Sequence, residues 1–378
     1  MMIKPFTDFY AEHGADLVSR EYSDQAALFR VREALFILLG VPPSAIRNRA
    51  VLEFGPGSGH YSVFNLRHRP RKYVFVEGVE EVRNALKNRL LASDIEEVSW
   101  EIKDDLFEAF ESDEKFDLVI AEACIHGQVD PAALFTHFVS FVEEGGILVV
   151  TTESACSKLS EILRRLVRDK LVSPRESVGA QLEVIVPVLR NHFINLKGLS
   201  RTPEDWIVDN IVQPVTGLKL FSIPDAMSAL PSEFSVLGTA PRFAQDFVWY
   251  RSVSDGRSHS RSTVTNSYYR NICSILDSRH PDTRVEAESG QELEGLCEEL
   301  FKSVGLLEEE NCKDWGDTMY RLRKIEDLLV RVGAPSLGAF QEIADWLASD
   351  STTTPMLKEF QDWWGMGMQH LSIYRGYL

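Results

Sequence analysis

Short apolar runs alternate with amphipathic stretches between residues 50 and 151, and this alternation limits the fold more than any other feature of the chain. The stretches between the runs, such as 79–91 and 131–142, have the length and the apolar spacing of helices. Strands that alternate with helices predict a parallel sheet with helices on both faces, that is, a doubly wound α/β fold. The predicted strands cover residues 50–54, 73–76, 98–102, 116–121 and 146–151.

Other elements are expected around this core. The chain has 378 residues, and single hydrophobic cores usually stop growing at roughly 250 to 300 residues. Helical spacing dominates both flanks, while residues 233–251 resemble two strands joined by a Gly/Pro turn. The predicted regions are an N-terminal helical segment over 1–45 that covers a ligand site, a core over 46–152, a helical cap over 153–230, an antiparallel strand pair over 231–252 that completes the sheet, and a helical C-terminal region over 266–378.

The overall charge makes nucleic acid a poor partner. Asp and Glu number 57 against 40 Lys and Arg, which gives a formal charge of −17. A field of this sign repels phosphate backbones, so we expect no nucleic-acid binding. One local exception is a basic cluster formed by Arg164, Arg165, Arg168 and Lys170.

The cysteines and the hydropathy pattern point to the cytoplasm. The five cysteines are scattered without paired spacing, which is typical of reduced thiols. No apolar run approaches the 18 residues of a membrane span, and the N-terminus lacks a secretory leader. The nine histidines show no metal-ligand spacing, so we expect neither a metal nor a membrane partner.

A glycine-rich turn follows the first predicted strand. Residues 51–59 read Val-Leu-Glu-Phe-Gly-Pro-Gly-Ser-Gly, with Glu53 in the strand and Gly55, Gly57 and Gly59 in the turn. Glycines let the backbone turn tightly and approach a ligand closely because no Cβ intervenes. A tight turn without a ligand would have the same pattern, so the turn needs support from other residues.

Carboxylates follow the next three strands. Glu77 comes after the second strand, Asp104 and Asp105 come after the third, and Glu122 comes after the fourth. The carboxyl ends of parallel strands meet at one edge of a sheet, where such folds bind ligands. A carboxylate in the place of Glu77 can accept hydrogen bonds from the two ribose hydroxyls of a nucleoside.

Together these segments resemble the class I S-adenosylmethionine-dependent methyltransferase superfamily over about residues 48–152. The resemblance implies a seven-stranded sheet in the order 3-2-1-4-5-7-6 with the last strand antiparallel. It also implies S-adenosylmethionine as cofactor, which becomes S-adenosylhomocysteine. The implied cofactor residues are Glu53, Gly55, Gly57 and Gly59 for the methionine part, Glu77 for the ribose, Asp105 or Asp104 with Leu106 for the adenine, and Glu122 facing the sulfonium.

A nicotinamide-dependent enzyme is the natural competitor, since it also uses a glycine loop and a carboxylate after the second strand. The loop here reads Gly-x-Gly-x-Gly rather than Gly-x-Gly-x-x-Gly. No clear second mononucleotide-binding half follows the fifth strand. The methyltransferase interpretation is therefore favoured.

Catalytic residues are less clear from the sequence. His126 follows the fourth strand and is the candidate general base, because histidine titrates near neutral pH. Glu122 is the second catalytic candidate, and Tyr22 is an aromatic candidate for covering the cofactor. His126 could equally be a loop residue that packs or contacts the cofactor.

The expected acceptor is a small polar molecule enclosed by the cap and the C-terminal helices. Residues 122–125 read Glu-Ala-Cys-Ile and lack the Asn/Asp-Pro-Pro-aromatic motif that related enzymes use for amide-type or ring nitrogens. This favours oxygen or aliphatic nitrogen, or carbon. Alternatives are a protein or peptide methyltransferase, and a catalytically silent scaffold. A homodimer formed through the C-terminal helices is a further hypothesis.

Overall fold

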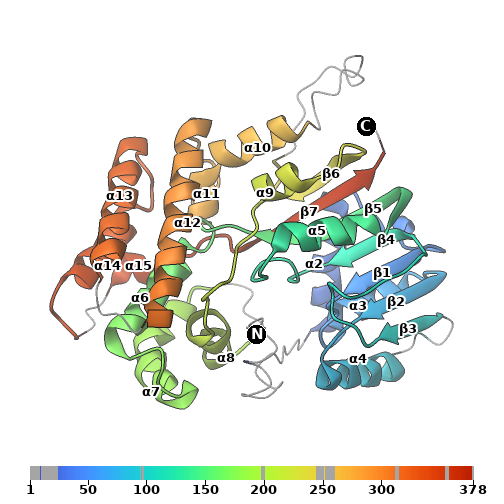
Figure 1. Cartoon of the computed structure of the whole chain (residues 1–378), viewed down its shortest axis with the longest axis horizontal. Coiled ribbons are helices and arrows are strands. Elements are labelled where there is room, and N and C mark those ends of the chain that lie inside the picture. Colours follow the sequence, from blue (N-terminus) through green and yellow to red (C-terminus); the bar gives the residue numbers. More distant parts are fainter. Residues whose placement is uncertain are drawn as a thin grey trace. The chain divides into compact units, whose positions relative to one another are not determined.

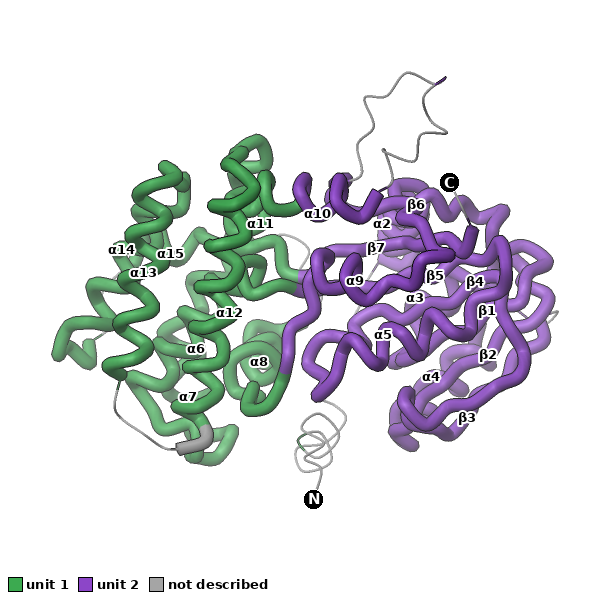
Figure 2. Tube along the Cα trace, turned by 45° about the horizontal axis from the view of Figure 1, so that its top comes forward, with its two compact units in different colours: residues 1–21, 154–218, 268–367 green, residues 22–153, 219–267, 368–378 purple. Residues whose placement is uncertain are grey.

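The computed structural model describes residues 9, 24–93, 95, 98–196, 201–243, 251, 260–310, 315–353 and 357–376. The chain divides into two compact units (Figure 2). One unit holds the sheet and comprises residues 22–153, 219–267 and 368–378. The other is helical and comprises residues 1–21, 154–218 and 268–367, so most of the predicted cap and most of the predicted C-terminal region belong to one unit.

The described residues contain one sheet of seven strands in the order β3-β2-β1-β4-β5-β7-β6 (Figure 1). β1 to β5 are parallel, and β7 runs antiparallel to both β5 and β6. This confirms the predicted sheet. The strands are β1 Ala50–Phe54, β2 Lys72–Val76, β3 Trp100–Lys103, β4 Phe116–Ala121, β5 Val142–Glu153, β6 Phe234–Ala240 and β7 Met368–Arg375.

Helices pack on both faces of this sheet. On one face, Phe36 and Leu86 belong to a core that includes Val51, Tyr73 and Ile120 of the strands. On the opposite face, Phe138 packs against Phe54 with ring centroids 4.2 Å apart. The helices of this unit are α2 Gln25–Leu38, α3 His60–Arg67, α4 Glu80–Ala92, α5 Pro131–Ser140 and α9 Ile223–Ala229, and α10 Arg261–Arg270 crosses the boundary between the units.

The source of β7 corrects the interpretation of the C-terminal region as helical throughout. The sheet takes β7 from residues 368–375, which pair with β5 and β6. Phe234–Ala240 forms β6, while most of the second strand predicted for 231–252 lies outside the described residues. The run is short and follows a long helical stretch, and its pairing partners lie far away in the sequence, so no local pattern indicates its place.

Helices build the second unit. Their apolar stripes predicted core packing, and α13 buries Leu322, Ile325 and Leu329 as expected. None of the helices in the described part of the chain has both the length and the apolar character that crossing a bilayer requires. The helices are α6 Leu159–Leu171, α7 Val178–Leu189, α8 Pro203–Ile207, α11 Ile272–Leu276, α12 Ala287–Glu310, α13 Gly316–Val332, α14 Leu337–Ala348 and α15 Lys358–Asp362.

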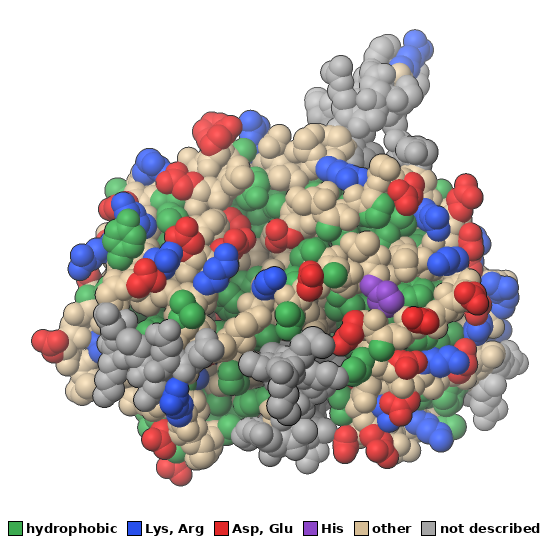
Figure 3. Space-filling model, viewed as in Figure 1, with side chains coloured by type: hydrophobic (Ala, Val, Ile, Leu, Met, Phe, Trp, Pro, Cys, Tyr) green, Lys and Arg blue, Asp and Glu red, His purple; other side chains and the backbone are tan. Residues whose placement is uncertain are grey.

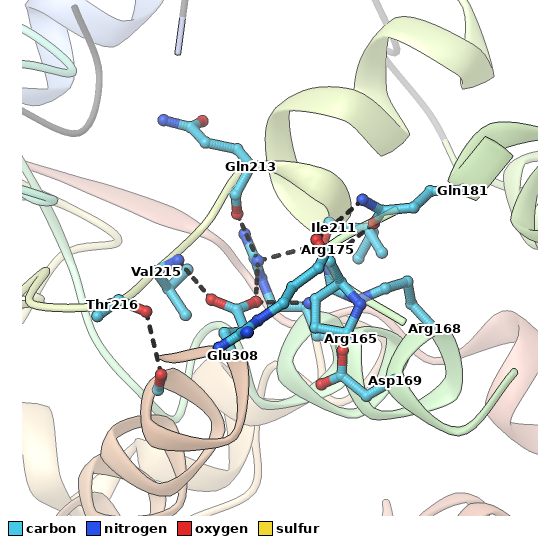
Figure 4. Close-up of polar contacts among 12 residues, drawn as sticks. Arg165, Arg168, Asp169, Arg175, Gln181, Ile211, Gln213, Val215, Thr216 and Glu308 are labelled. Carbon is cyan, nitrogen blue, oxygen red and sulfur yellow. Dashed lines mark hydrogen bonds and ion pairs between the residues drawn. The ribbon is translucent and has the colours of Figure 1, made fainter. Parts of the chain in front are cut away.

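The basic cluster of α6 is not a surface patch. Arg164, Arg165 and Arg168 are at most 4% exposed. Arg165 and Arg168 both donate to Glu308 Oε1 of α12, at 3.2 and 2.5 Å (Figure 4). The arginines therefore hold helices together, and on the molecular face in Figure 3 acidic and basic side chains are interspersed.

Candidate active site

The glycine turn follows β1 directly and leads into α3. Gly55, Gly57 and Gly59 have φ angles of +61°, +53° and +80°, which L side chains rarely adopt. Gly59 is the residue that precedes the first turn of α3. A Cβ at Gly57 would meet no atom within 4 Å, so the backbone here is open to a neighbouring group. The loop is thus shaped for close approach.

Glu77 lies at the carboxyl end of β2. The residue is 7% exposed, and its Oε1 accepts a hydrogen bond from the Val79 N–H at 3.0 Å. Burial raises the pKa of the Glu77 carboxyl, while the bond from Val79 and the charge of Arg83 limit the rise. An ionised carboxylate has about four lone-pair sites, so Glu77 can accept further hydrogen bonds from a ligand's hydroxyl groups.

The two aspartates after β3 differ in their surroundings. The side chain of Asp104 is 70% exposed and pairs with Arg83 at 2.6 Å. Asp105 and Leu106 lie beside Gly78 instead, since a Cβ on Gly78 would sit 3.0 Å from Leu106 Cδ2 and 3.4 Å from the Asp105 carbonyl oxygen. Asp105 and Leu106 therefore line the turn that contains Glu77, whereas the Asp104 side chain is exposed.

Glu53 is a buried carboxyl with its own hydrogen-bond chain. Tyr73 Oη donates to Glu53 Oε2 at 2.5 Å, and Asn65 Nδ2 donates to Tyr73 Oη at 2.9 Å. Burial raises the pKa of Glu53 to about 7, and the bond from Tyr73 and the charge of Arg32 limit the rise. Near neutral pH, Glu53 is divided between its ionised and protonated forms.

Glu122, which follows β4, is engaged by two residues that the sequence analysis did not select. Arg32 of α2 donates to Glu122 Oε1 at 2.6 Å, and its second nitrogen contacts Oε2. His370 Nε2 of β7 lies 3.4 Å from Glu122 Oε1. Burial alone would raise the pKa of Glu122, but the charge of Arg32 and the bond from His370 hold it well below its usual range.

His126 pairs with a carboxylate from the end of β5. Its Nε2 lies 3.6 Å from Glu153 Oε2, and the two side chains are 13% and 5% exposed. A short segment holds both residues in place: Phe221 exchanges two backbone hydrogen bonds with Glu153, and the Lys219 carbonyl accepts from Gly127 N–H at 2.8 Å. The pair places a histidine beside a buried carboxylate, and histidine is the side chain most often used for proton transfer.

The comparison with known proteins settles the class of this domain. A family model described as a methyltransferase domain matches residues 21–183. Residues 21–183 of the chain form a methyltransferase domain. No curated protein matches the chain.

Several solved structures resemble the chain, and methyltransferases are among them. An O-methyltransferase family protein from Burkholderia thailandensis is 19% identical over 34% of this chain and 40% of that chain, with a TM-score of 0.29. The CcbJ methyltransferase from Streptomyces caelestis is 21% identical over 35% and 50%, with a TM-score of 0.27. PKMT2 from Rickettsia typhi in complex with AdoHcy is 16% identical over 64% and 49%, with a TM-score of 0.40. The chain thus spans about half the length of these proteins.

The residues of the methyltransferase domain fit its cofactor. The open backbone at Gly57 leaves room for a ligand, and the buried carboxyl of Glu53, in the strand that leads into this turn, suits the ammonium group of the methionine part. Glu77 presents an acceptor for hydroxyl groups. Tyr22, the aromatic candidate for covering the cofactor, lies outside the described residues.

Three site residues escaped prediction from sequence. Arg32 and Tyr73 sit in patterns that indicate an amphipathic helix and a buried strand, and His370 lies in the unpredicted strand β7. The one available signal was a charged or polar residue at an otherwise apolar position, as with Arg32 at 2% exposure. Such a residue needs a buried partner.

We expect Gly55→Ala to destabilise the methyltransferase domain by about 2 to 3 kcal/mol and Gly57→Ala by about 1 kcal/mol. Both positions have a positive φ, but only a Cβ at Gly55 would collide, at 2.6 Å from Cys124 Sγ and 3.1 Å from Phe107 Cζ. Urea unfolding of the two variants measures the difference. Equal losses would show that the contact with Cys124 does not restrict this position.

Proposed function

We propose that this chain transfers the methyl group of S-adenosylmethionine to an oxygen or an aliphatic nitrogen of a small polar acceptor. The observation that carries the proposal is the His126–Glu153 pair at the same edge of the sheet as the glycine turn and Glu77. A base at this edge would accelerate transfer to an acceptor that loses a proton as it gains a methyl group.

The cofactor residues proposed are those that the resemblance implies and the geometry supports. Glu53 and the turn from Gly55 to Gly59 would hold the methionine part, and Glu77 would accept from the ribose hydroxyls. Asp105 and Leu106 would take the adenine in preference to exposed Asp104. When bound, the cofactor supplies an electrophilic methyl group on a sulfonium.

The chain's own residues then align the acceptor and remove its proton. Alignment alone can supply roughly 7 to 11 kcal/mol, and a positioned base typically adds about 10² to 10⁴ in rate. His126 is the proposed base, with Glu153 holding the imidazole ring. Glu122 is ionised and paired with Arg32, so it places a negative charge near the methyl donor. Its lowered pKa means that it does not exchange protons near neutral pH.

We expect binding of S-adenosylhomocysteine to weaken about tenfold from pH 8 to pH 6, because the ionised fraction of a carboxyl with a pKa of about 7 falls by that factor. The ligand's ammonium favours ionised Glu53, so protons compete with the ligand. Tyr73, Arg32 and Glu122 surround this carboxyl and keep their charge states over the range. Calorimetric titrations at several pH values measure the effect. In Glu53→Gln, binding is expected to be weaker and nearly independent of pH, and an unchanged pH dependence in this variant would contradict the assignment.

The experiment that tests the proposed function is methyl transfer from S-adenosylmethionine labelled in its methyl group to a panel of small alcohols, amines and carboxylic acids. The expected result is label in a small product, reduced about 10² to 10⁴-fold in His126→Asn. Label found only in added proteins or peptides would overturn the choice of a small acceptor. Label at full rate in His126→Asn would remove His126 as base.

A further inference from the structure

We propose that His370 is a further acceptor-binding residue, and that Arg32 and Glu122 hold its imidazole so that Nδ1 accepts a hydrogen bond from an O–H or N–H group of the methyl acceptor. This proposal rests on the proposed function and assigns to β7 a part in acceptor recognition. It starts from three side chains that come from α2, the end of β4 and β7.

Arg32 is the fixed end of the arrangement. The residue is 2% exposed, and its guanidinium lies 4.2 Å from the ring centroid of Phe36 and 4.7 Å from that of Tyr61. A planar guanidinium packed between two rings has little freedom, and it matches a carboxylate through two parallel contacts. Its contacts to both oxygens of Glu122 therefore set the orientation of that carboxylate.

The oriented carboxylate of Glu122 in turn positions the imidazole of His370. Its Oε1 receives Arg32 at 2.6 Å and lies 3.4 Å from His370 Nε2. A carboxylate at Nε2 favours the tautomer with hydrogen on Nε2, and this leaves the lone pair of Nδ1 to accept a hydrogen bond. Glu122 is thus a positioning residue, committed to Arg32 and His370.

The sheet brings His370 to the cofactor edge. His370 is opposite Thr151 in the β5–β7 pairing, and Thr151 Oγ1 accepts from the Ala123 N–H of the loop after β4 at 2.6 Å. The side chain of His370 is 23% exposed, whereas that of Arg32 is buried. Glu122 is 15% exposed, so His370 is the most accessible member of the group. Its unprotonated nitrogen discriminates in favour of acceptors that carry a donor group.

The test is nitrogen-15 NMR of the histidine rings in the full chain, with His370 assigned by comparison with His370→Asn. We expect the signals of a ring that carries its hydrogen on Nε2 and has a lone pair on Nδ1, and loss of this single tautomer in Glu122→Gln. Glu153→Gln is the matched control, because it removes the carboxylate beside His126 and should leave the His370 signals unchanged. A wild-type His370 protonated at Nδ1 would overturn the proposal even if Glu122→Gln does not fold.

Addition of S-adenosylhomocysteine separates this proposal from the proposed function. The His370 signals should shift on binding, while those of His137, whose ring packs on Phe141 of the sheet unit 4.8 Å away, should not. Binding without any shift at His370 would overturn the proposal and leave the methyltransferase function standing. No binding at all by folded wild-type protein would overturn both.

Discussion

Glu308→Ala is expected to destabilise the helical unit by about 3 to 5 kcal/mol, which is the usual cost of removing one partner from a buried ion pair. The side chain of Glu308 is 4% exposed. Its Oε1 receives Arg165 and Arg168, and its Oε2 accepts from the Val215 N–H at 2.8 Å (Figure 4). Without the carboxylate, two arginines would remain buried with less compensation. Urea unfolding followed by tryptophan fluorescence measures the loss, since Trp206, Trp346, Trp363 and Trp364 lie in this unit.

Glu299→Ala is the matched control. Glu299 belongs to the same helix as Glu308 and pairs with Arg321, but its side chain is 55% exposed. Exposed ion pairs typically contribute about 0 to 1 kcal/mol, so this variant should unfold close to the wild type. Equal effects of the two substitutions would contradict the view that the buried network holds α6 and α12 together.

Glu77→Ala is expected to weaken binding of S-adenosylhomocysteine about 100-fold or more. Hydrogen bonds to a charged group contribute about 1.5 to 3 kcal/mol each, and the proposed role of Glu77 includes two ribose hydroxyls. Glu77 is 7% exposed, so a ligand would contact this carboxylate where little water competes for its hydrogen bonds. Isothermal titration calorimetry of the variant and the wild type measures the change.

Asp104→Ala gives the control for this second prediction. Asp104 is also a carboxylate that follows a strand of the same sheet edge, but its exposed side chain pairs with Arg83. Its removal should change the Kd less than about threefold, within the contribution of an exposed pair. If Asp104→Ala weakened binding as much as Glu77→Ala, a general loss of negative charge would explain both results and the ribose assignment would fail.

The parallel strands of the sheet could be predicted from sequence because their apolar patterns are local. Each strand from β1 to β5 contains a short apolar run next to a helical stretch. The glycine turn marks the first connection from a strand to a helix, between β1 and α3. β7 could not be predicted because its pairing with β5 joins residues that are more than 200 positions apart, such as Thr151 and His370. A short strand after many helices carries no local mark of such a partner.

The candidate site likewise contains residues that could be predicted from local patterns and residues that could not. Glu53, Glu77 and Glu122 could be placed at one edge because each belongs to or follows a parallel strand. Their partners Arg32, Tyr73 and His370 reach them through tertiary packing, which the spacing of residues in the sequence does not predict. The arginines of α6 resembled a surface patch for the same reason, since Glu308, which binds Arg165 and Arg168, is supplied by a helix that is distant in the sequence.

The most direct test of the central claim is a crystal structure of the chain with S-adenosylhomocysteine. The account predicts density beside the turn from Gly55 to Gly59, with the ribose hydroxyls at Glu77 and the sulfur near Glu122. Density at another place, or none from crystals grown at saturating ligand, would contradict the proposed cofactor site.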